Sequence, residues 1–332
     1  MIDRNLLGTW IRRFLLEYLV GERNLSRNTQ ASYRDTLTLL LPFASKRTGV
    51  AIDKMAVTDL SPSVVRQFLD YLERERHCTG VTRNQRLGTI HSLARFIGMR
   101  SPVHLSWCTD VRLVPFKKTD KTLITYLEKA EMDALLRQPD RHTVLGLRDY
   151  CLLLFLYNSG ARADEAARLT IDHLHLDDPP SVRIHGKGNK IRMCPLWPMM
   201  MPLLEKLING RGTDQVVFLG RANKPMTRFG IHRLVTHYAE MASDEMPSIQ
   251  AKRVSPHNIR HTTAVHMLRS GVDINTIRAW LGHVSLDTTN IYAEVDLEMK
   301  AKALASVDVS GQPAEPLRQR HLPSLMTFLR GI

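Results

Sequence analysis

The chain has 332 residues, 43% of them hydrophobic, and its 46 Lys and Arg outnumber its 33 Asp and Glu, for a formal net charge of +13. Such a composition supports packed cores, and the length suggests two domains. The longest strongly apolar run, Cys151 to Tyr157, is far shorter than the ~20 residues of a membrane span, which excludes a membrane protein. The four cysteines form no C-x-x-C pair, so we expect reduced thiols in a cytoplasmic protein. The basic balance favours a nucleic acid as partner, and a solvated basic surface is the ordinary alternative.

The first hundred residues predict a compact unit of four helices. Apolar residues at helical spacing indicate helices over residues 6–18, from Ser26 to residue 41, from Ser61-Pro62 to residue 72, and from Thr79 or Thr82 to residue 97. Basic residues that we expect on exposed faces here and just beyond are candidate contacts to DNA phosphates: Arg27, Arg34, Arg83, Arg86, Arg95, Lys117 and Lys118. An ordinary solvated helix face is the alternative for each of them.

The helical pattern breaks over residues 101–124, where Pro102, Pro115 and a lysine-rich run predict an extended basic linker. We therefore expect a helical domain over 1–106, a linker over 107–122, a second domain over 123–308 and a tail over 309–332. In the second domain, residues 128–136 and 145–158 predict helices, and alternating apolar residues predict a β-hairpin over 182–196. The predicted fold class is mainly α, with a helical N-terminal domain and a mixed α+β second domain that holds a small antiparallel sheet.

The first chemical motif follows the buried helix that ends at Ser159-Gly160. A new helix is expected to start there with Arg162 in its first turn, and an Arg beside the free N–H groups of a helix N-terminus makes a strong anion site. Glu165 lies three residues on and can orient Arg162. The alternative is a plain Arg–Glu pair that contributes only about 0.3 kcal/mol.

The second motif is Lys187, which lies between Gly186 and Gly188 at the tip of the predicted hairpin. A lysine at such a mobile turn can reach into a neighbouring site. A solubilising turn lysine is the usual case.

The third motif is His257-Asn258-Ile259-Arg260. Ser255 and Pro256 start a helix, so His257 and Arg260 share one face of its first turn. His257 and His261 are four residues apart, which is a spacing that metal-binding histidines use. No nearby carboxylate or Cys completes such a site. We therefore predict no metal.

The fourth motif joins His283 to Tyr292. Gly282 ends a helix over residues 274–281, His283 follows in a loop, and a fresh helix from Leu286 presents Tyr292. The alternative for Tyr292 is a half-buried packing residue.

Together these motifs suit chemistry on a phosphodiester. Guanidinium groups grip the non-bridging oxygens and stabilise the charge of the transition state. A tyrosine with an ordinary pKa of ~10 needs a base or an electropositive pocket to act as a nucleophile at neutral pH, and the leaving sugar oxygen needs an acid, for which Lys187 is the natural candidate. No acidic cluster is present to hold Mg²⁺, so we expect no cofactor.

The order and spacing of these residues resemble the tyrosine recombinase (phage integrase) family. Its pattern of Arg, Lys, H-x-x-R, His and Tyr is matched by Arg162, Lys187, His257 with Arg260, His283 and Tyr292. The resemblance implies that the N-terminal domain is a SAM-like core-binding domain and the second the catalytic domain. Because the first helix begins close to Met1, we expect no separate arm-binding domain, as in the Xer-like or transposon-borne members.

The resemblance also implies a mechanism. Tyr292 attacks a DNA phosphate to form a 3′-phosphotyrosyl link, and strands exchange through a Holliday junction without metal or ATP. Arg162 and Arg260 clamp the phosphate and His257 serves as the base. Lys187 protonates the 5′-oxygen, His283 hydrogen-bonds the phosphate, and Glu165 supports Arg162.

The implied partner is double-stranded DNA with paired inverted half-sites, bound by a homotetramer or together with a second recombinase. The implied role is DNA integration or transposition for a mobile element, with the C-terminal tail packed on a neighbouring subunit or on its own chain. Two rival functions are strand relaxation of the type IB topoisomerase kind and non-catalytic regulation by DNA binding.

Overall fold

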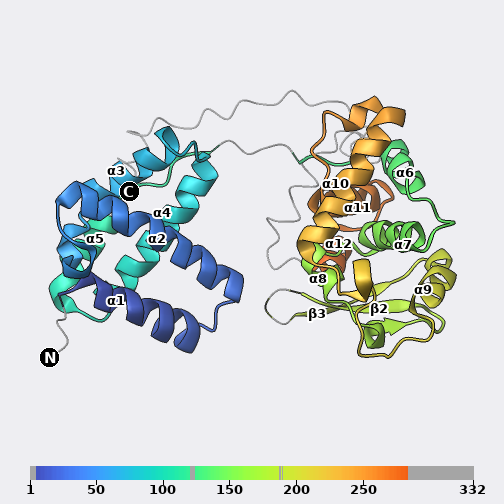
Figure 1. Ribbon diagram of the computed structural model, residues 1–332, viewed down its shortest axis with the longest axis horizontal. Helices are drawn as coiled ribbons and strands as arrows, with labels where there is room; N and C mark the ends of the chain where they lie inside the picture. The colour runs from blue at the N-terminus through green and yellow to red at the C-terminus, as the bar shows by residue number, and fades with distance from the viewer. Residues whose placement is uncertain (1–4, 120–123, 187, 189, 283–332) are drawn as a thin grey trace, which may run out of the picture. The chain divides into compact units, whose positions relative to one another are not determined.

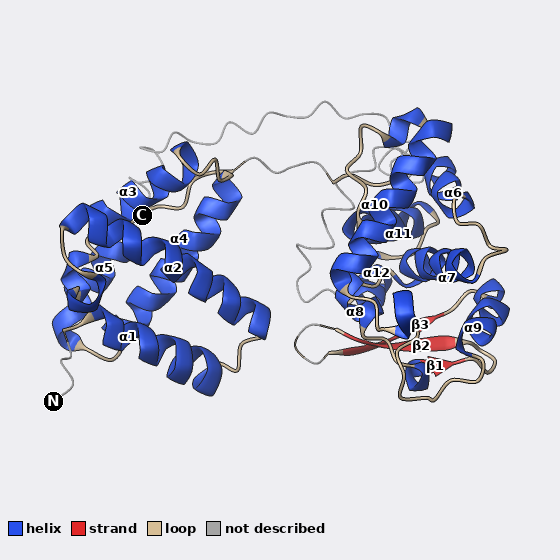
Figure 2. Cartoon of the chain, in the orientation of Figure 1, coloured by secondary structure: helices blue, strands red, loops and turns tan. Residues whose placement is uncertain are grey.

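The computed structural model describes residues 5–119, 124–186, 188 and 190–282, and the chain divides into two compact units, Met1–Lys121 and Thr122–Ile332. Both units are largely helical, and the second also holds a small sheet (Figures 1 and 2). The predicted fold class is therefore confirmed. Among the described residues, no helix is long and apolar enough to cross a membrane.

The N-terminal unit is built from helices around one apolar core. They are α1 (Leu7–Arg13), the π-helical η1 (Phe14–Glu22), α2 (Arg27–Thr48), α3 (Pro62–Arg74), α4 (Gly80–Gly98) and α5 (Leu105–Arg112). The hydroxyls of Ser26, Ser61 and Thr79 cap α2, α3 and α4, so Thr79 and not Thr82 starts the fourth predicted helix. The first predicted helix is present, but its second half is π-helical.

Residues 101–124 differ from the prediction of an extended linker, because α5 occupies their first half. Pro102 does not end the helical structure. It begins a short 3-10 turn, Pro102–His104, that leads into α5, since proline is well tolerated at the first helical position. Trp107, Cys108 and Val111 of α5 are buried in the N-terminal core, and the Trp107 indole donates a hydrogen bond to the Leu60 carbonyl at 2.9 Å. The part of the linker predicted to start at residue 107 therefore belongs to the first unit.

The second unit surrounds a helix whose residues 149–159 are all buried. Its helices are α6 (Lys129–Arg137), α7 (Val144–Ser159), α8 (Ala163–Ala167), α9 (Met201–Ile208), α10 (Arg228–Glu245), α11 (Pro256–Arg269) and α12 (Ile274–Leu281). Helix α7 carries a continuous apolar run from Tyr150 to Tyr157 and packs against α6, α9 and α11. The predicted helices at 128–136, 145–158 and 274–281 are confirmed, with Glu128 and Gly282 at the expected ends.

A three-stranded antiparallel sheet adjoins these helices, in the order β1 (Leu174–His175), β2 (Ser181–His185) and β3 (Ile191–Pro195). The predicted hairpin is β2–β3, with His185 opposite Ile191. The predicted alternation of buried apolar and exposed polar residues is present on β2 but not on β3. On β3, Ile191 and Met193 are 57% and 50% exposed, while Arg192 and Cys194 face the core. A charged side chain is therefore turned toward the interior of the unit.

Candidate active site

Three chain segments far apart in sequence meet where α7 ends. Gly160 follows α7 in the left-handed region with φ +58°, and a Cβ there would lie 2.5 Å from Leu281 of α12. Glycine is the residue that adopts this backbone conformation without strain, and here it also permits the close approach of α12. Thr263 of α11 donates to the Tyr157 carbonyl at 2.7 Å and holds α11 against the same end.

Arg260 lies inside this junction, with its side chain almost completely buried. Its Nη1 donates to the Gly160 carbonyl and its Nη2 to the Leu281 carbonyl, each at 2.6 Å. Both carbonyls belong to helix ends, where the last C=O groups lack partners within the helix. These two carbonyls thus orient the guanidinium group.

Arg162 lies at the N-cap of α8 and not, as predicted, in its first turn. The backbone N–H of Arg162 donates to Glu165 Oε2 at 3.0 Å, and its Nη1 donates to Oε1 at 2.7 Å. The predicted Arg162–Glu165 contact is present. Of the N–H groups at this helix end, that of Arg162 is occupied by Glu165. The Arg162 side chain remains 39% exposed.

Glu165 is bound by two guanidinium groups. Its carboxylate is 2% exposed and accepts Arg192 Nη2 at 2.7 Å in addition to Arg162. Burial alone raises the pKa of Glu165, but the hydrogen bonds and charges of Arg192 and Arg162 outweigh burial and hold the pKa below its ordinary value. The carboxylate is therefore ionised, and the group of three carries a net positive charge.

A small cavity of about 240 Å³ brings Arg162, His257 and Arg260 together. Arg228, Phe229 and His232 of α10 line its other side. Loss of solvent around the ring lowers the pKa of His257, and the nearby Arg260 and Arg162 lower it further. None of the described residues that line this cavity is acidic.

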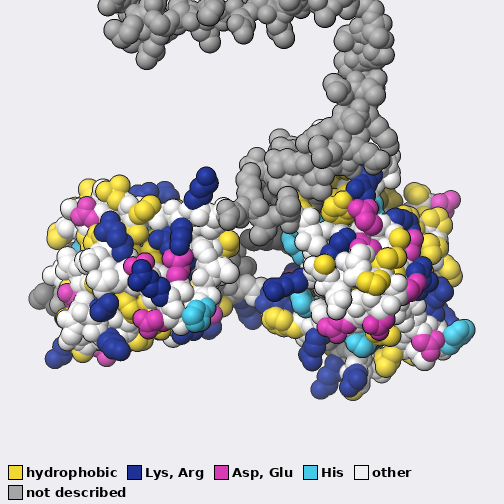
Figure 3. Space-filling view, turned by 90° about the horizontal axis from the view of Figure 1, so that it is seen from above, with side chains coloured by type: hydrophobic (Ala, Val, Ile, Leu, Met, Phe, Trp, Pro, Cys, Tyr) yellow, Lys and Arg dark blue, Asp and Glu magenta, His cyan; other side chains and the backbone are white. Residues whose placement is uncertain are grey.

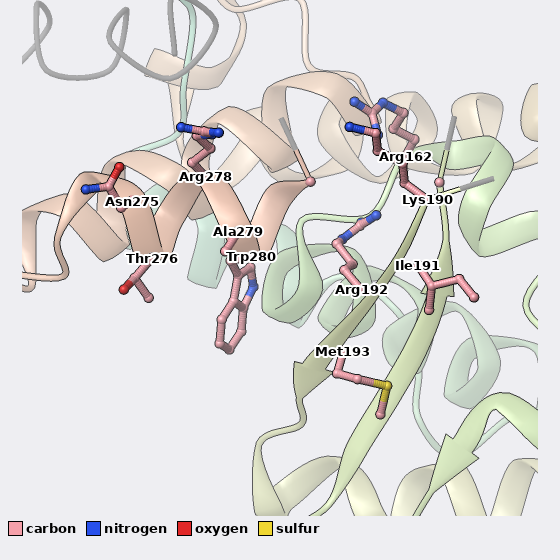
Figure 4. A pocket seen from close by; sticks show the side chains of 12 residues that line it. Arg162, Lys190, Ile191, Arg192, Met193, Asn275, Thr276, Arg278, Ala279 and Trp280 are labelled. Atoms are coloured by element: carbon pink, nitrogen blue, oxygen red, sulfur yellow. The ribbon is translucent and has the colours of Figure 1, made fainter. Parts of the chain in front are cut away.

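A larger cavity of about 710 Å³ opens on the other side of Arg162. It runs between the β2–β3 hairpin and α12, and it is lined by Arg162, Gly186, Lys190, Arg192, Arg278 and Gly282 among others. In Figure 4 the side chain of Arg192 extends from β3 toward Arg162, while Met193 points away. Within the described part of the chain this lining too contains no carboxylate.

The structure thus brings together Arg162, Glu165, His257 and Arg260. Lys187, His283 and Tyr292 lie outside the described residues, as do the predicted helix from Leu286 and the tail over 309–332. Gly186 and Lys190, on either side of Lys187 in the hairpin, line the larger cavity, and so does Gly282, which precedes His283. Among the described residues, no group of three or more His, Cys, Asp or Glu is placed to hold a metal ion.

Several residues that line the two cavities are not part of the predicted site. Arg192 was detectable, because a hairpin that turns between His185 and Ile191 places residue 192 opposite Ile184, on the core face. Arg228, His232 and the α12 residues Thr276 and Arg278 carried no such signal. They reach the cavities only through the tertiary packing of α10 and α12.

The predicted DNA contacts of the N-terminal unit differ in exposure. Arg27, Arg34, Arg95, Lys117 and Lys118 are exposed, as expected. Arg83 and Arg86 are half-buried, contrary to expectation, and Arg83 donates to Asn84 and to the Pro115 carbonyl at 3.0 Å. Arg34 pairs with Asp35 and Lys117 with Glu73. On the face of this unit that Figure 3 shows, Lys and Arg are spread among acidic residues.

Comparison with known proteins gives the class. The description "Phage integrase family" matches residues 125–299, and "Phage integrase, N-terminal SAM-like domain" matches residues 11–100. The chain belongs to the phage integrase family and is a tyrosine-type site-specific recombinase.

Individual relatives cover nearly the whole chain. A putative integrase/recombinase, y4rC, of Sinorhizobium fredii is 33% identical over 328 residues, 98% of each chain. Tyrosine recombinase XerD of Haemophilus influenzae is 33% identical over 294 residues, 86% of this chain and 93% of that one. The solved structure of the Tn1549 transposon integrase in complex with a circular intermediate DNA has a TM-score of 0.67 at 14% identity and covers 91% of this chain and 99% of that one, a similarity of fold.

Proposed function

We propose that this recombinase cleaves and rejoins DNA through a 3′-phosphotyrosyl link to Tyr292 and exchanges strands through a Holliday junction. One observation carries the proposal: Arg162 lines one cavity together with His257 and Arg260, although about 95 residues separate it from them in sequence. None of the described residues that line this cavity is acidic. Such a cavity attracts a phosphate and stabilises the additional charge of its transition state. The match to the catalytic family extends through residue 299 and so includes positions 283 and 292.

Each residue then has a defined task. The Tyr292 oxygen forms a bond to phosphorus, the bond from phosphorus to the 5′-oxygen breaks, and Arg162 and Arg260 bind the non-bridging oxygens. The lowered pKa of His257 keeps its imidazole neutral at pH 7, which is the form that accepts the tyrosine proton. Lys187 donates a proton to the 5′-oxygen, and His283 hydrogen-bonds the phosphate. The tyrosyl ester conserves the bond energy, so neither metal nor ATP is required.

The DNA partner is a duplex with paired inverted half-sites, bound by a homotetramer. In the N-terminal unit, Gln85 donates to Ser32 at 2.8 Å and so joins the second turns of α2 and α4. Arg27 and Arg34 lie on α2 near this contact, and we assign them, with Arg83, Arg86, Arg95, Lys117 and Lys118, to the phosphate backbone. The Tn1549 integrase, a transposon enzyme solved with a circular intermediate DNA, supports a role in a mobile element.

The decisive test is Tyr292→Phe. The probe is a nicked duplex taken from the DNA that flanks the gene, chosen for inverted repeats of about 11 base pairs around a short spacer. The wild type is expected to form a covalent adduct that migrates with protein in a denaturing gel. The variant should bind the duplex with unchanged affinity and form no adduct.

The rival functions predict other outcomes. A non-catalytic regulator forms no adduct in either protein. A relaxing enzyme of the type IB kind forms the adduct but does not recombine two separate plasmids. Truncation after Ala305 tests the tail: loss of paired-site synapsis with intact single-site binding supports packing on a neighbouring subunit, and unchanged synapsis contradicts it.

A further inference from the structure

We propose that Arg192 is a positioning residue that keeps Arg162 available to the DNA phosphate and holds the hairpin and the end of α12 in one arrangement. The inference rests on the proposed function, because it concerns how the phosphate-binding group is maintained. It assigns a task to a residue that the motif comparison leaves out.

The sheet register forces Arg192 inward. Arg192 lies opposite Ile184, which is 1% exposed, and its own side chain is 8% exposed. A buried guanidinium group is costly unless it is paired and hydrogen-bonded. Its ion pair with Glu165 at 2.7 Å supplies the charged partner through Nη2, whereas the buried Nε has no hydrogen-bond partner among the described residues. The pair joins β3 to α8, and therefore the hairpin to the segment that carries Arg162.

The charges of Arg162, Glu165 and Arg192 explain why two arginines share one carboxylate. Glu165 uses Oε1 for Arg162 and Oε2 for Arg192. Without Arg192, the carboxylate would be paired with Arg162 alone, and the cation assigned to the phosphate would be neutralised. With Arg192 present, the group of three keeps a net charge of +1, and its exposed member is Arg162, at 39% against 8% for Arg192 and 2% for Glu165.

The guanidinium group of Arg192 also packs against two glycines. A Cβ added at Gly282 would lie 3.3 Å from Arg192 Cδ and 3.6 Å from Nη1, and one added at Gly186 would lie 3.5 Å from Nη1. Gly186 closes the hairpin through its N–H to the Lys190 carbonyl at 2.7 Å, and Gly282 is the left-handed cap of α12. In sequence, these glycines immediately precede Lys187 and His283. The side chain of Arg192 thus lies close to Gly186 and Gly282, the residues that precede Lys187 and His283.

The test compares Arg192→Met, which keeps most of the volume but removes the charge, with Arg192→Lys, which keeps the charge. The matched control is Arg168→Met on α8, whose side chain is 66% exposed and pairs with Asp164. On the nicked flanking duplex, we expect R192M to bind with unchanged affinity and to form the adduct about 10–100-fold more slowly. R192K should recover part of that loss, and R168M should remain within about twofold of the wild type.

A second readout separates positioning from mere structural support. A duplex whose cleaved phosphate is replaced by a methylphosphonate carries no charge there, so it no longer needs an available cation. If Arg192 acts through Arg162, the loss in R192M relative to the wild type is smaller on the methylphosphonate than on the phosphate, as in Arg162→Gln. An equal loss on both substrates overturns the inference, and so does an adduct rate of R192M within twofold of the wild type. R192K replaces R192M if circular dichroism shows that R192M does not fold. The loss of adduct rate in R192K is then compared between the phosphate and the methylphosphonate duplex, with the same two outcomes. Absence of adduct in the wild type instead overturns the proposed function and, with it, this inference.

Discussion

Arg260 illustrates how a charged side chain is accommodated where three helices meet. Two helix-end carbonyls, at Gly160 and Leu281, accept its N–H groups, so the residue that orients the site also satisfies backbone groups of the fold. In the proposed function, stability and phosphate binding therefore depend on the same contacts at this position. Arg162 differs, because its side chain is 39% exposed and forms an ion pair with Glu165.

His261 makes stability depend on pH. Burial, followed by the nearby His257 and Arg260, lowers the pKa of His261 to about 4. Because the unfolded chain has the ordinary pKa near 6.5 and binds the proton more readily, the free energy of unfolding falls as pH drops from about 6.5 to about 4, by at most about 3 kcal/mol. We expect urea unfolding of His261→Phe at pH 7 and pH 5 to show a smaller difference than the wild type. His175→Asn, which changes an exposed histidine, is the control and should leave the wild-type difference intact. Equal pH dependence in all three proteins contradicts the assignment.

At the scale of elements, the site depends on where helices stop. Helix α7 ends at Gly160 and α12 at Gly282, both in the left-handed region, and β3 begins after a turn closed by Gly186. Each end places a catalytic-motif residue within two positions of a glycine. Small residues at these ends allow the segments to approach closely, which larger residues would prevent.

Gly160→Ala tests this arrangement. The substitution strains the backbone at φ +58° and places a Cβ 2.5 Å from Leu281. Gly271→Ala is the matched control, since Gly271 follows α11 with φ +84° and a Cβ there meets nothing within 4 Å. We expect the control to lower the free energy of unfolding by about 1–2 kcal/mol from backbone strain alone. Gly160→Ala should lower it by about 1–3 kcal/mol more, through overpacking. Equal losses in urea unfolding would show that the Leu281 contact is unimportant.

At the scale of the whole molecule, each unit has its own hydrophobic core, and the border between them lies further along the chain than the prolines suggest. The N-terminal core includes Trp107, Cys108, Val111 and Val114, all beyond the predicted domain end at residue 106. Gly98 of α4 lies so close to α5 that a Cβ there would be 2.7 Å from Cys108. Helix α5 is therefore an integral layer of the first unit.

This border predicts different behaviour for two fragments. A fragment of residues 1–121 should unfold cooperatively in urea, because it retains the whole cluster. A fragment of residues 1–106 lacks two Val and one Trp of the core, a loss of about 5 kcal/mol or more, which is comparable with the total stability of a small domain. We expect it to show no cooperative transition by circular dichroism. Equal stability of both fragments would contradict the assignment of α5 to the core of the first unit.

The sequence by itself determined the helices, because their start and stop signals are local. Ser61-Pro62, Ser255-Pro256 and Gly282 act through hydrogen bonds and backbone angles within a few residues, and each lies where it was predicted. The motif around Arg162, His257 and Arg260 was likewise visible from residue type and spacing. Tertiary structure decided what depends on contacts between distant segments. It paired Arg192 with Glu165, added α10 to the smaller cavity, and made the segment after Pro102 part of a core. No local signal can determine these features, because the free energy that stabilises them comes from partners more than twenty residues away.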